Sequence, residues 1–98
     1  MYRLLAICSS NLAAAYLLEG DGMYAEKALE SAERAEEMDP TYEKGYYRQA
    51  RAHEVMGNVD KAISAMERAL ACPEIVDKSA IDVRIAELQA AKEMSTGK

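Results

Sequence analysis

Three basic side chains stand four and three residues apart in the segment YEKGYYRQARAHEVMG. Lys44, Arg48 and Arg51 share one face of any helix that contains them, because residues three and four apart lie on the same side of a helix. Lysine and arginine in this spacing can bind a carboxylate, since the ammonium supplies a point charge and the guanidinium a fork of donors. The segment therefore contains a candidate anion-binding face.

Composition restricts what this face can serve. The chain has 98 residues, half of them apolar and 30% charged, with neither Phe nor Trp. This length fits one small domain, and the composition is typical of a soluble all-α protein. The net charge of −5 argues against nonspecific binding to nucleic acid or to an anionic membrane. We expect an all-α domain with no nucleic-acid and no membrane partner.

The basic face belongs to a repeated stretch of the chain. Aligning Gly20 with Gly57, 37 residues later, places Asn11 opposite Arg48. Each stretch is predicted to be a helix that ends at its glycine, where the left-handed conformation costs least because the residue lacks a Cβ atom.

A second pair of stretches repeats at 34 residues, where EKALESAERAEEMDP lies over DKAISAMERALACPE. Each unit is therefore predicted to be helix, turn, helix. The two offsets differ by three residues, which places an insertion in the internal turn of the first unit, around 19–22. We expect this turn to be longer and looser than its counterpart around Gly57.

Paired helices with a 34-residue period, with small residues at close approaches and Pro after the second helix, resemble the tetratricopeptide repeat. The resemblance implies two helix-turn-helix units stacked as an α-solenoid, at 6–42 and 43–76, followed by a capping helix at 77–94. The matching residues are Ala13, Tyr16, Gly20, Ala28, Ala35 and Pro40 in the first unit, and Tyr46, Ala50, Gly57, Ala62 and Ala69 in the second.

The capping helix is predicted from an apolar stripe. Ile81, Ile85 and Leu88 recur at helical spacing with charged residues between them. The stripe looks like the solvating helix that closes tetratricopeptide arrays, with Asp77 as its N-cap. Pro73 stands one residue earlier than the repeat pattern expects.

In such arrays the first helix of each unit lines the concave groove. The resemblance therefore places Ser10, Asn11 and Ala14 in the groove beside the basic face. The second helix of the first unit, 24–39, holds six acidic and two basic residues and would form the back. Positive charge is thus expected to concentrate in the groove of an acidic molecule, which suits an acidic, extended peptide.

A narrower resemblance involves the strings SSNLAAAYLLEG and YEKGYYRQA. They look like the second and third repeats of the carboxylate-clamp subfamily of heat-shock cochaperones, in which Lys, Asn and Arg hold the terminal carboxylates of a Glu-Glu-Val-Asp tail. By position, Asn11 matches the second-repeat Asn, Lys44 the third-repeat Lys and Arg48 the third-repeat Arg. The resemblance implies an adaptor that binds the acidic C-terminal peptide of a heat-shock chaperone, with Tyr47 and Arg51 giving secondary contacts.

The repeat that would supply the other clamp Lys and Asn is not in this chain, since five residues precede the first unit. Losing two charge-assisted hydrogen bonds at about 1.5 kcal/mol each weakens binding roughly a hundredfold. Leu4, Leu5, Ile7 and Cys8 are also left without a neighbouring unit. We expect either a larger parent protein that supplies the missing repeat or a homodimer. The alternative function is an assembly module that oligomerises through this face and has no peptide ligand.

Two other interpretations of the basic face stay open. It can be an ordinary solvated surface whose bases pair with Glu43 and Glu54. It can also recognise some other acidic ligand, as a regulatory segment. His53 is expected to pack between helices, and Met66 to fill the core. No phosphate-binding loop, metal-ligand cluster or nucleophile motif occurs, so we expect neither an enzyme nor a cofactor.

The two cysteines, Cys8 and Cys72, form no Cys-x-x-Cys pair and have no nearby His, which argues against zinc and redox sites. We expect two free, buried thiols and a reducing, cytoplasmic location. The opening eighteen residues resemble a signal peptide, but the uninterrupted apolar run from Leu4 to Cys8 is too short for one. A mostly buried helix is the preferred interpretation.

Overall fold

The computed structural model describes residues 3–18, 23–73 and 78–96, with side chains up to residue 93. The predicted long turn at 19–22 and the predicted N-cap at Asp77 lie outside these ranges. The described residues contain no strand and form five helices, which confirms the all-α prediction: α1 (Arg3–Leu18), α2 (Ala25–Met38), α3 (Glu43–Val55), α4 (Val59–Leu70) and α5 (Lys78–Thr96).

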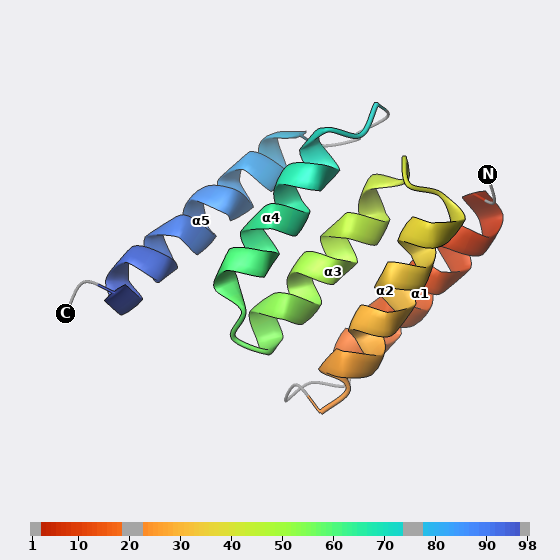
Figure 1. Cartoon of the computed structure of the whole chain (residues 1–98), viewed down its shortest axis with the longest axis horizontal. Coiled ribbons are helices and arrows are strands. Elements are labelled where there is room, and N and C mark those ends of the chain that lie inside the picture. Colours follow the sequence, from red (N-terminus) through yellow and green to blue (C-terminus); the bar gives the residue numbers. More distant parts are fainter. Residues whose placement is uncertain (1–2, 19–22, 74–77, 97–98) are drawn as a thin grey trace.

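Helices α3, α4 and α5 lie side by side in chain order, α1 lies behind α2, and consecutive helices run in opposite directions (Figure 1). Each helix contacts the next, and α1 also contacts α3. The molecule is an elongated slab with principal extents of 45, 30 and 17 Å. The basic segment of the sequence forms α3, in the middle of the molecule, whereas α1 and α5 lie at opposite ends (Figure 1).

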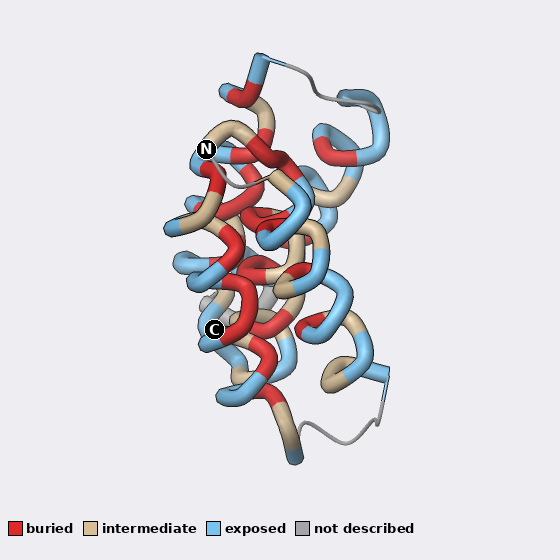
Figure 2. The backbone as a smooth tube through the Cα atoms, turned by 90° about the vertical axis from the view of Figure 1, so that its right-hand side faces the viewer, coloured by how far each residue is buried: buried red, intermediate tan, exposed pale blue. Residues whose placement is uncertain are grey.

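Alanines line the faces at which the helices meet, and the buried residues run along the inner sides of the backbone tube (Figure 2). Small side chains allow helices to approach closely. A Cβ atom added at Gly45 would lie 3.4 Å from the Cβ of Ala35, so α2 and α3 are in close contact there. The alanines that are at most 3% exposed are Ala6, Ala13, Ala25, Ala28, Ala32, Ala35, Ala50, Ala52, Ala62, Ala65 and Ala69.

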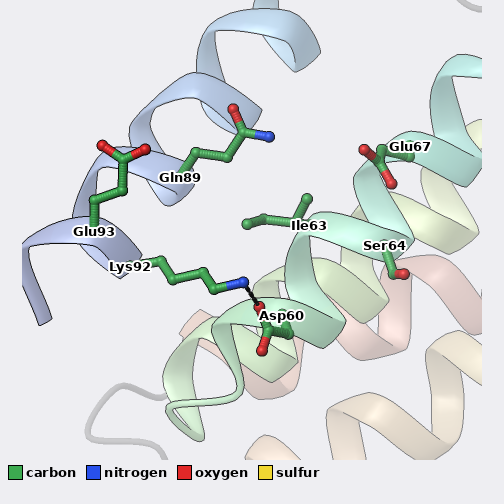
Figure 3. Close-up of a pocket in the computed structure, with 7 residues that line it drawn as sticks. All are labelled: Asp60, Ile63, Ser64, Glu67, Gln89, Lys92 and Glu93. Carbon is green, nitrogen blue, oxygen red and sulfur yellow. Dashed lines mark ion pairs between the residues drawn. The ribbon is translucent and has the colours of Figure 1, made fainter. Parts of the chain in front are cut away.

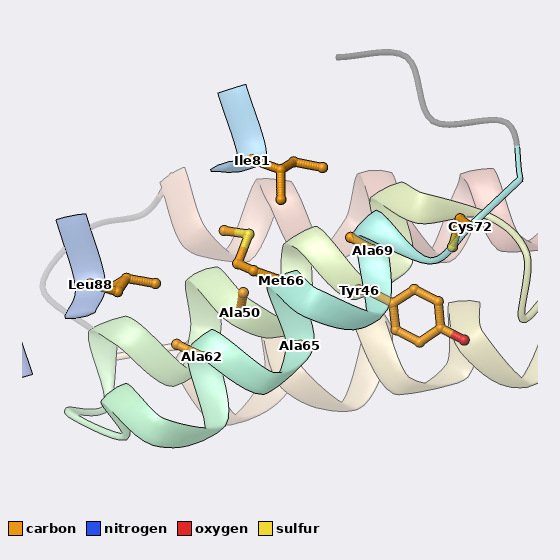
Figure 4. Close-up of a cluster of buried hydrophobic side chains, with 9 residues drawn as sticks. All are labelled: Tyr46, Ala50, Ala62, Ala65, Met66, Ala69, Cys72, Ile81 and Leu88. Atoms are coloured by element: carbon orange, nitrogen blue, oxygen red, sulfur yellow. The ribbon is translucent and has the colours of Figure 1, made fainter. Parts of the chain in front are cut away.

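The largest hydrophobic cluster, called the main cluster below, joins α3, α4 and α5 (Figure 4). Met66 of α4 lies at its centre and is fully buried, as predicted from the sequence. Ile81 and Leu88 of α5 are each 6% exposed, and Ile85 packs against the cluster. The predicted apolar stripe of the last helix is therefore confirmed.

The end of α3 is a glycine turn. Gly57 has a φ of 85°, in the left-handed region. Its N–H donates to the carbonyl of Glu54 at 3.0 Å, and the N–H of Asn58 donates to the carbonyl of His53 at 2.8 Å. These two bonds define a Schellman motif, which satisfies the last carbonyls of the helix. The prediction that a glycine ends this helix is confirmed here, whereas Gly20 lies outside the described residues.

The prediction that the first helix is mostly buried is wrong. In α1 the buried residues are Ala6, Ser10 and Ala13. Among the described residues, α2 and α3 are the helices that contact α1, and half-buried Ile7, Tyr16 and Leu17 also pack against buried clusters. Four leucines of α1 are exposed: Leu4 by 78%, Leu5 by 52%, Leu12 by 47% and Leu18 by 86%.

The prediction of two buried thiols is wrong for one of them. Cys72 is buried in the main cluster, but Cys8 is exposed on α1. Cys8 lies one turn from Leu4, on the side of α1 that no other helix covers. Ile7, which was grouped with Cys8 in the predicted face, is instead half-buried and packs against Ala6 and Tyr42.

Candidate peptide-binding surface

Two cations on α3 have no ion-pair partner among the described residues, and both were predicted to bind peptide. Lys44 is exposed and Arg48 is half-buried. The guanidinium of Arg48 lies over the ring of Tyr47, 5.6 Å from its centroid, and Tyr47 in turn packs against the main cluster. The Nε atom of Arg48 is buried and has no hydrogen-bond partner among these residues. The ring of Tyr47 thus supports the side chain of Arg48, whose Nε donor is not used among the described residues.

Arg51 is in a different situation, because its Nη1 atom lies 3.3 Å from the carboxylate of Glu54. The same carboxylate accepts hydrogen bonds from Arg84 of α5. The interpretation of a self-paired basic face therefore holds for Arg51. It does not hold for Glu43, whose Oε2 atom is buried without a hydrogen-bond partner in the described part of the chain.

Arg84 was not singled out from the sequence. It connects α5 to α3 through Glu54 and also bonds Glu87 at 2.9 Å, and these hydrogen bonds raise the pKa of its guanidinium. Arg84 stands three residues after Ile81 and four before Leu88, so it lies beside the apolar stripe, and its long side chain reaches Glu54 of α3 from there. This spacing was the signal in the sequence that could have singled out Arg84.

Asn11 lies on α1, which contacts α3. Its side chain is exposed. Ser10, expected beside it in the groove, is instead fully buried, and its Oγ atom has no hydrogen-bond partner among the described residues. That expectation is wrong because Ser10 lies on the packed side of α1, with Ala6 and Ala13. Asn11 is therefore an exposed residue of α1, whereas Lys44 and Arg48 lie on the contacting helix α3.

The first residue of α1 is tied to the loop between α2 and α3. Arg3 donates to the carboxylate of Asp39 and to the hydroxyl of Thr41, and its guanidinium lies 5.0 Å from the ring centroid of Tyr42. The hydroxyl of Thr41 donates to Asp39 at 2.6 Å. The hydrogen bonds from Thr41 and Arg3 lower the pKa of Asp39 to about 2. Arg3 is therefore already paired with a carboxylate.

The acidic helix α2 is connected to α3 and α4 through Glu36. Arg68 of α4 binds the Glu36 carboxylate while lying over the ring of Tyr46, at 4.6 Å. The amide of Gln49 donates to the same carboxylate at 2.9 Å. This network fixes the side of the molecule formed by the second helix of each unit.

His53 lies at a hollow of about 470 Å³ that Leu29, Lys61 and other residues of α2, α3 and α4 line. Its Nδ1 atom is buried without a hydrogen-bond partner in the described ranges. Burial, and to a lesser extent the charge of Lys61, lower the pKa of the imidazole. His53 is thus a half-buried histidine whose neutral form is favoured, as a packing residue requires.

A hollow of about 620 Å³ lies between α4 and α5 (Figure 3). Lys92 of α5 reaches across it to the carboxylate of Asp60 on α4. The remaining lining includes Ile63 and the exposed carboxylates of Glu67 and Glu93. The hollow contains none of the predicted peptide-binding residues, so the candidate site is an open helical surface rather than this hollow.

Within the described residues, no group of His, Cys, Asp and Glu side chains is placed to hold a metal ion. The same part of the chain has no helix that is long and apolar enough to cross a bilayer. The chain matches no protein-family model, no curated protein and no solved structure.

Proposed function

We propose that this chain is an adaptor of the tetratricopeptide type that binds an acidic C-terminal peptide of a heat-shock chaperone. Several features support the tetratricopeptide assignment. They are the two sequence repeats, the antiparallel helix pairs packed in chain order, the glycine turn at Gly57 and the amphipathic α5. The reducing location expected for such an adaptor is the cytoplasm.

The ligand assignment rests on one observation: Lys44 and Arg48 of α3 have no ion-pair partner among the described residues. A ligand carboxylate can therefore pair with the guanidinium of Arg48 without first displacing a carboxylate of the described residues. Lys44, one turn earlier, adds a second positive charge at the same surface. Two cations one helical turn apart suit the two oxygens of a terminal carboxylate.

The other predicted residues have smaller roles in this proposal. The amide of Asn11 can both donate to and accept from a peptide backbone. The ring of Tyr47 supports Arg48 and offers an apolar surface to the residue before the terminal Asp. Arg51 shares its charge with Glu54, so it contributes less to peptide binding than Lys44 or Arg48.

The proposal is tested by titrating labelled protein with a Met-Glu-Glu-Val-Asp peptide and recording chemical-shift changes. We expect shifts that map to Asn11, Lys44 and Arg48, with a dissociation constant on the order of 10⁻⁴ to 10⁻³ M, because a partial clamp makes few charge-assisted bonds. The shifts should shrink as salt is added, since exposed charges are screened.

Two controls separate a clamp from general attraction between charges. The peptide amidated at its C-terminus tests the carboxylate, and the variant Lys44→Ala with Arg48→Ala removes the two cations. The variant Lys27→Ala with Arg34→Ala removes the same charge from exposed positions of α2 and should bind as the wild type does. Equal binding of the amidated peptide, or equal losses in both double variants, would refute the clamp.

A further inference from the structure

The exposed side of α1 has the spacing of a coiled-coil seam. Leu4, Cys8, Asn11, Ala15 and Leu18 are all exposed and follow one another at intervals of four, three, four and three residues. This interval averages 3.5 residues, the period of a helix face that packs along its whole length against another helix. Nothing in the described part of the chain covers this stripe.

The stripe has the same pattern in both directions. A leucine stands at each end, a small residue lies inside each leucine, and Asn11 occupies the middle, seven residues from both Leu4 and Leu18. Among the described residues, these two leucines are the most exposed of the large apolar side chains, at 78% and 86%. A surface that is symmetric about its midpoint can pair with a copy of itself through a two-fold axis, which is the usual symmetry of homodimers.

Charge also favours a second copy as the partner. The described residues of α1 include one charged side chain, Arg3, and it already pairs with Asp39. Two α1 helices therefore meet without like charges in contact. By contrast, α2 exposes Glu26, Glu30 and further glutamates, which would leave carboxylates against an apolar stripe.

We propose that a second copy of this chain docks on α1, with the two α1 helices antiparallel and the two-fold axis near Asn11. Each terminal leucine then packs near the leucine at the opposite end of the partner helix. Cys8 and Ala15 are small enough to allow close approach, and antiparallel helix dipoles attract. A polar Asn in such a seam selects one register, because any other alignment buries its amide without a partner.

The proposed interface is small, so the dimer is weak. A helix of 16 residues is about 24 Å long. One pair of such helices buries less than the roughly 800 Å² per partner of a typical stable interface. We expect monomer and dimer to exchange at protein concentrations of about 10⁻⁴ M. This proposal does not depend on peptide binding.

The experiment is sedimentation velocity of the full chain from about 10⁻⁵ to 10⁻³ M, without ligand. The wild type should shift from monomer to dimer over this range. Leu4→Glu combined with Leu18→Glu places carboxylates together in either helix orientation, so we expect association at least about tenfold weaker. Leu4→Glu combined with Leu18→Lys places opposite charges together in the antiparallel pair alone, so it should dimerise markedly better than the double glutamate variant.

The control is Val83→Glu, which changes an exposed apolar residue of α5 and should leave dimerisation unchanged. Because the two leucines are exposed, circular dichroism should show every variant folded. A wild-type chain that is folded and monomeric at about 10⁻³ M overturns the proposal and assigns the stripe to a helix of different sequence. A dimer that persists in the double glutamate variant, or that is lost equally in the glutamate-lysine variant, overturns the antiparallel α1 pair.

Discussion

The two end helices, α1 and α5, solve the same packing problem differently. Among the described residues, α5 packs against α4, and α1 packs against α2 and α3, so each has one side that no other helix covers. On α5 the large apolar side chains that face α4, Ile81 and Leu88, are nearly buried, and most of the described residues that face outward are charged, polar or alanine. On α1 the fully buried residues are small, Ala6, Ser10 and Ala13, whereas four of its leucines are exposed.

The difference shows that apolar content alone does not make a helix a core element. A terminal helix can end a stack when its apolar residues form one narrow stripe, because one neighbour is enough to cover them. The sequence of α5 has such a stripe. The exposed leucines of α1 lie outside the side that α2 and α3 cover. This end of the molecule therefore has an apolar surface that α5 lacks.

The largest expected effect comes from truncating the stripe of α5. We expect Leu88→Ala to lower the free energy of unfolding by about 2–4 kcal/mol, because it leaves a cavity against Met66 and its neighbours. Leu18→Ala, at the exposed end, should change it by less than about 0.5 kcal/mol in the monomer. Urea unfolding of both variants at low concentration measures the comparison. Equal losses would mean that α1 is packed as tightly as α5.

A smaller effect is expected where α5 joins α3. Glu54→Gln removes the carboxylate that Arg51 and Arg84 share and should lower the free energy of unfolding by about 1 kcal/mol. Glu87→Gln removes an exposed partner of Arg84 and should cost less than half as much. Thermal unfolding of the two variants shows whether the ion pair between α3 and α5 stabilises the protein more than the exposed pair within α5. If Glu87→Gln proves the more harmful, the role given to Glu54 is wrong.

At the other end of the molecule, the hydrogen bonds that Asp39 accepts from Thr41 and Arg3 should appear in the acid stability. The folded-state pKa of Asp39, about 2, lies below its unfolded value, so this stabilisation is complete above about pH 4 and is lost as the pH falls toward 2. We expect Asp39→Asn to flatten the decline in stability between these pH values. Chemical denaturation across this range measures it. An unchanged slope would show that Asp39 does not titrate as described.

The smallest expected effect on stability, and the clearest on reactivity, concerns the two thiols. Cys8 is exposed on α1 and should react with an aromatic disulfide reagent at the rate of a free thiol. Cys72 is buried, and burial raises the pKa of its thiol, so it should react only as the helices open. Variants with one cysteine replaced by serine identify each phase. Equal rates would contradict the difference in burial.

Repetition was the feature from which the fold could be predicted. The helix pairs, the glycine turn at Gly57 and the stripe of α5 depend on local spacing and side-chain size, which a sequence displays directly. The burial of α1 was not predictable in this way. It depends on which sides of a helix have neighbours. An apolar run such as Leu4 to Cys8 has the same sequence whether its helix is buried or exposed.

The candidate site was predicted only in part, because local spacing was readable from the sequence and contacts between helices were not. The shared face of Lys44, Arg48 and Arg51 follows from helical periodicity. The pairing of Arg51 with Glu54 was one of two open interpretations, and the contribution of Arg84 depends on its reaching Glu54, which stands 30 residues earlier in the chain. The fully buried position of Ser10 likewise follows from how α1 is turned about its own axis, which repeat alignment does not fix.

The exposure of Asn11 has a thermodynamic consequence. If both proposals hold, the same amide contacts a peptide in the monomer and the partner chain in the dimer, so ligand and second copy compete. By linkage, peptide binding must then weaken dimerisation by the same free energy by which dimerisation weakens peptide binding. The apparent peptide affinity would fall as the chain is concentrated, so that local crowding of the adaptor would limit its own occupancy.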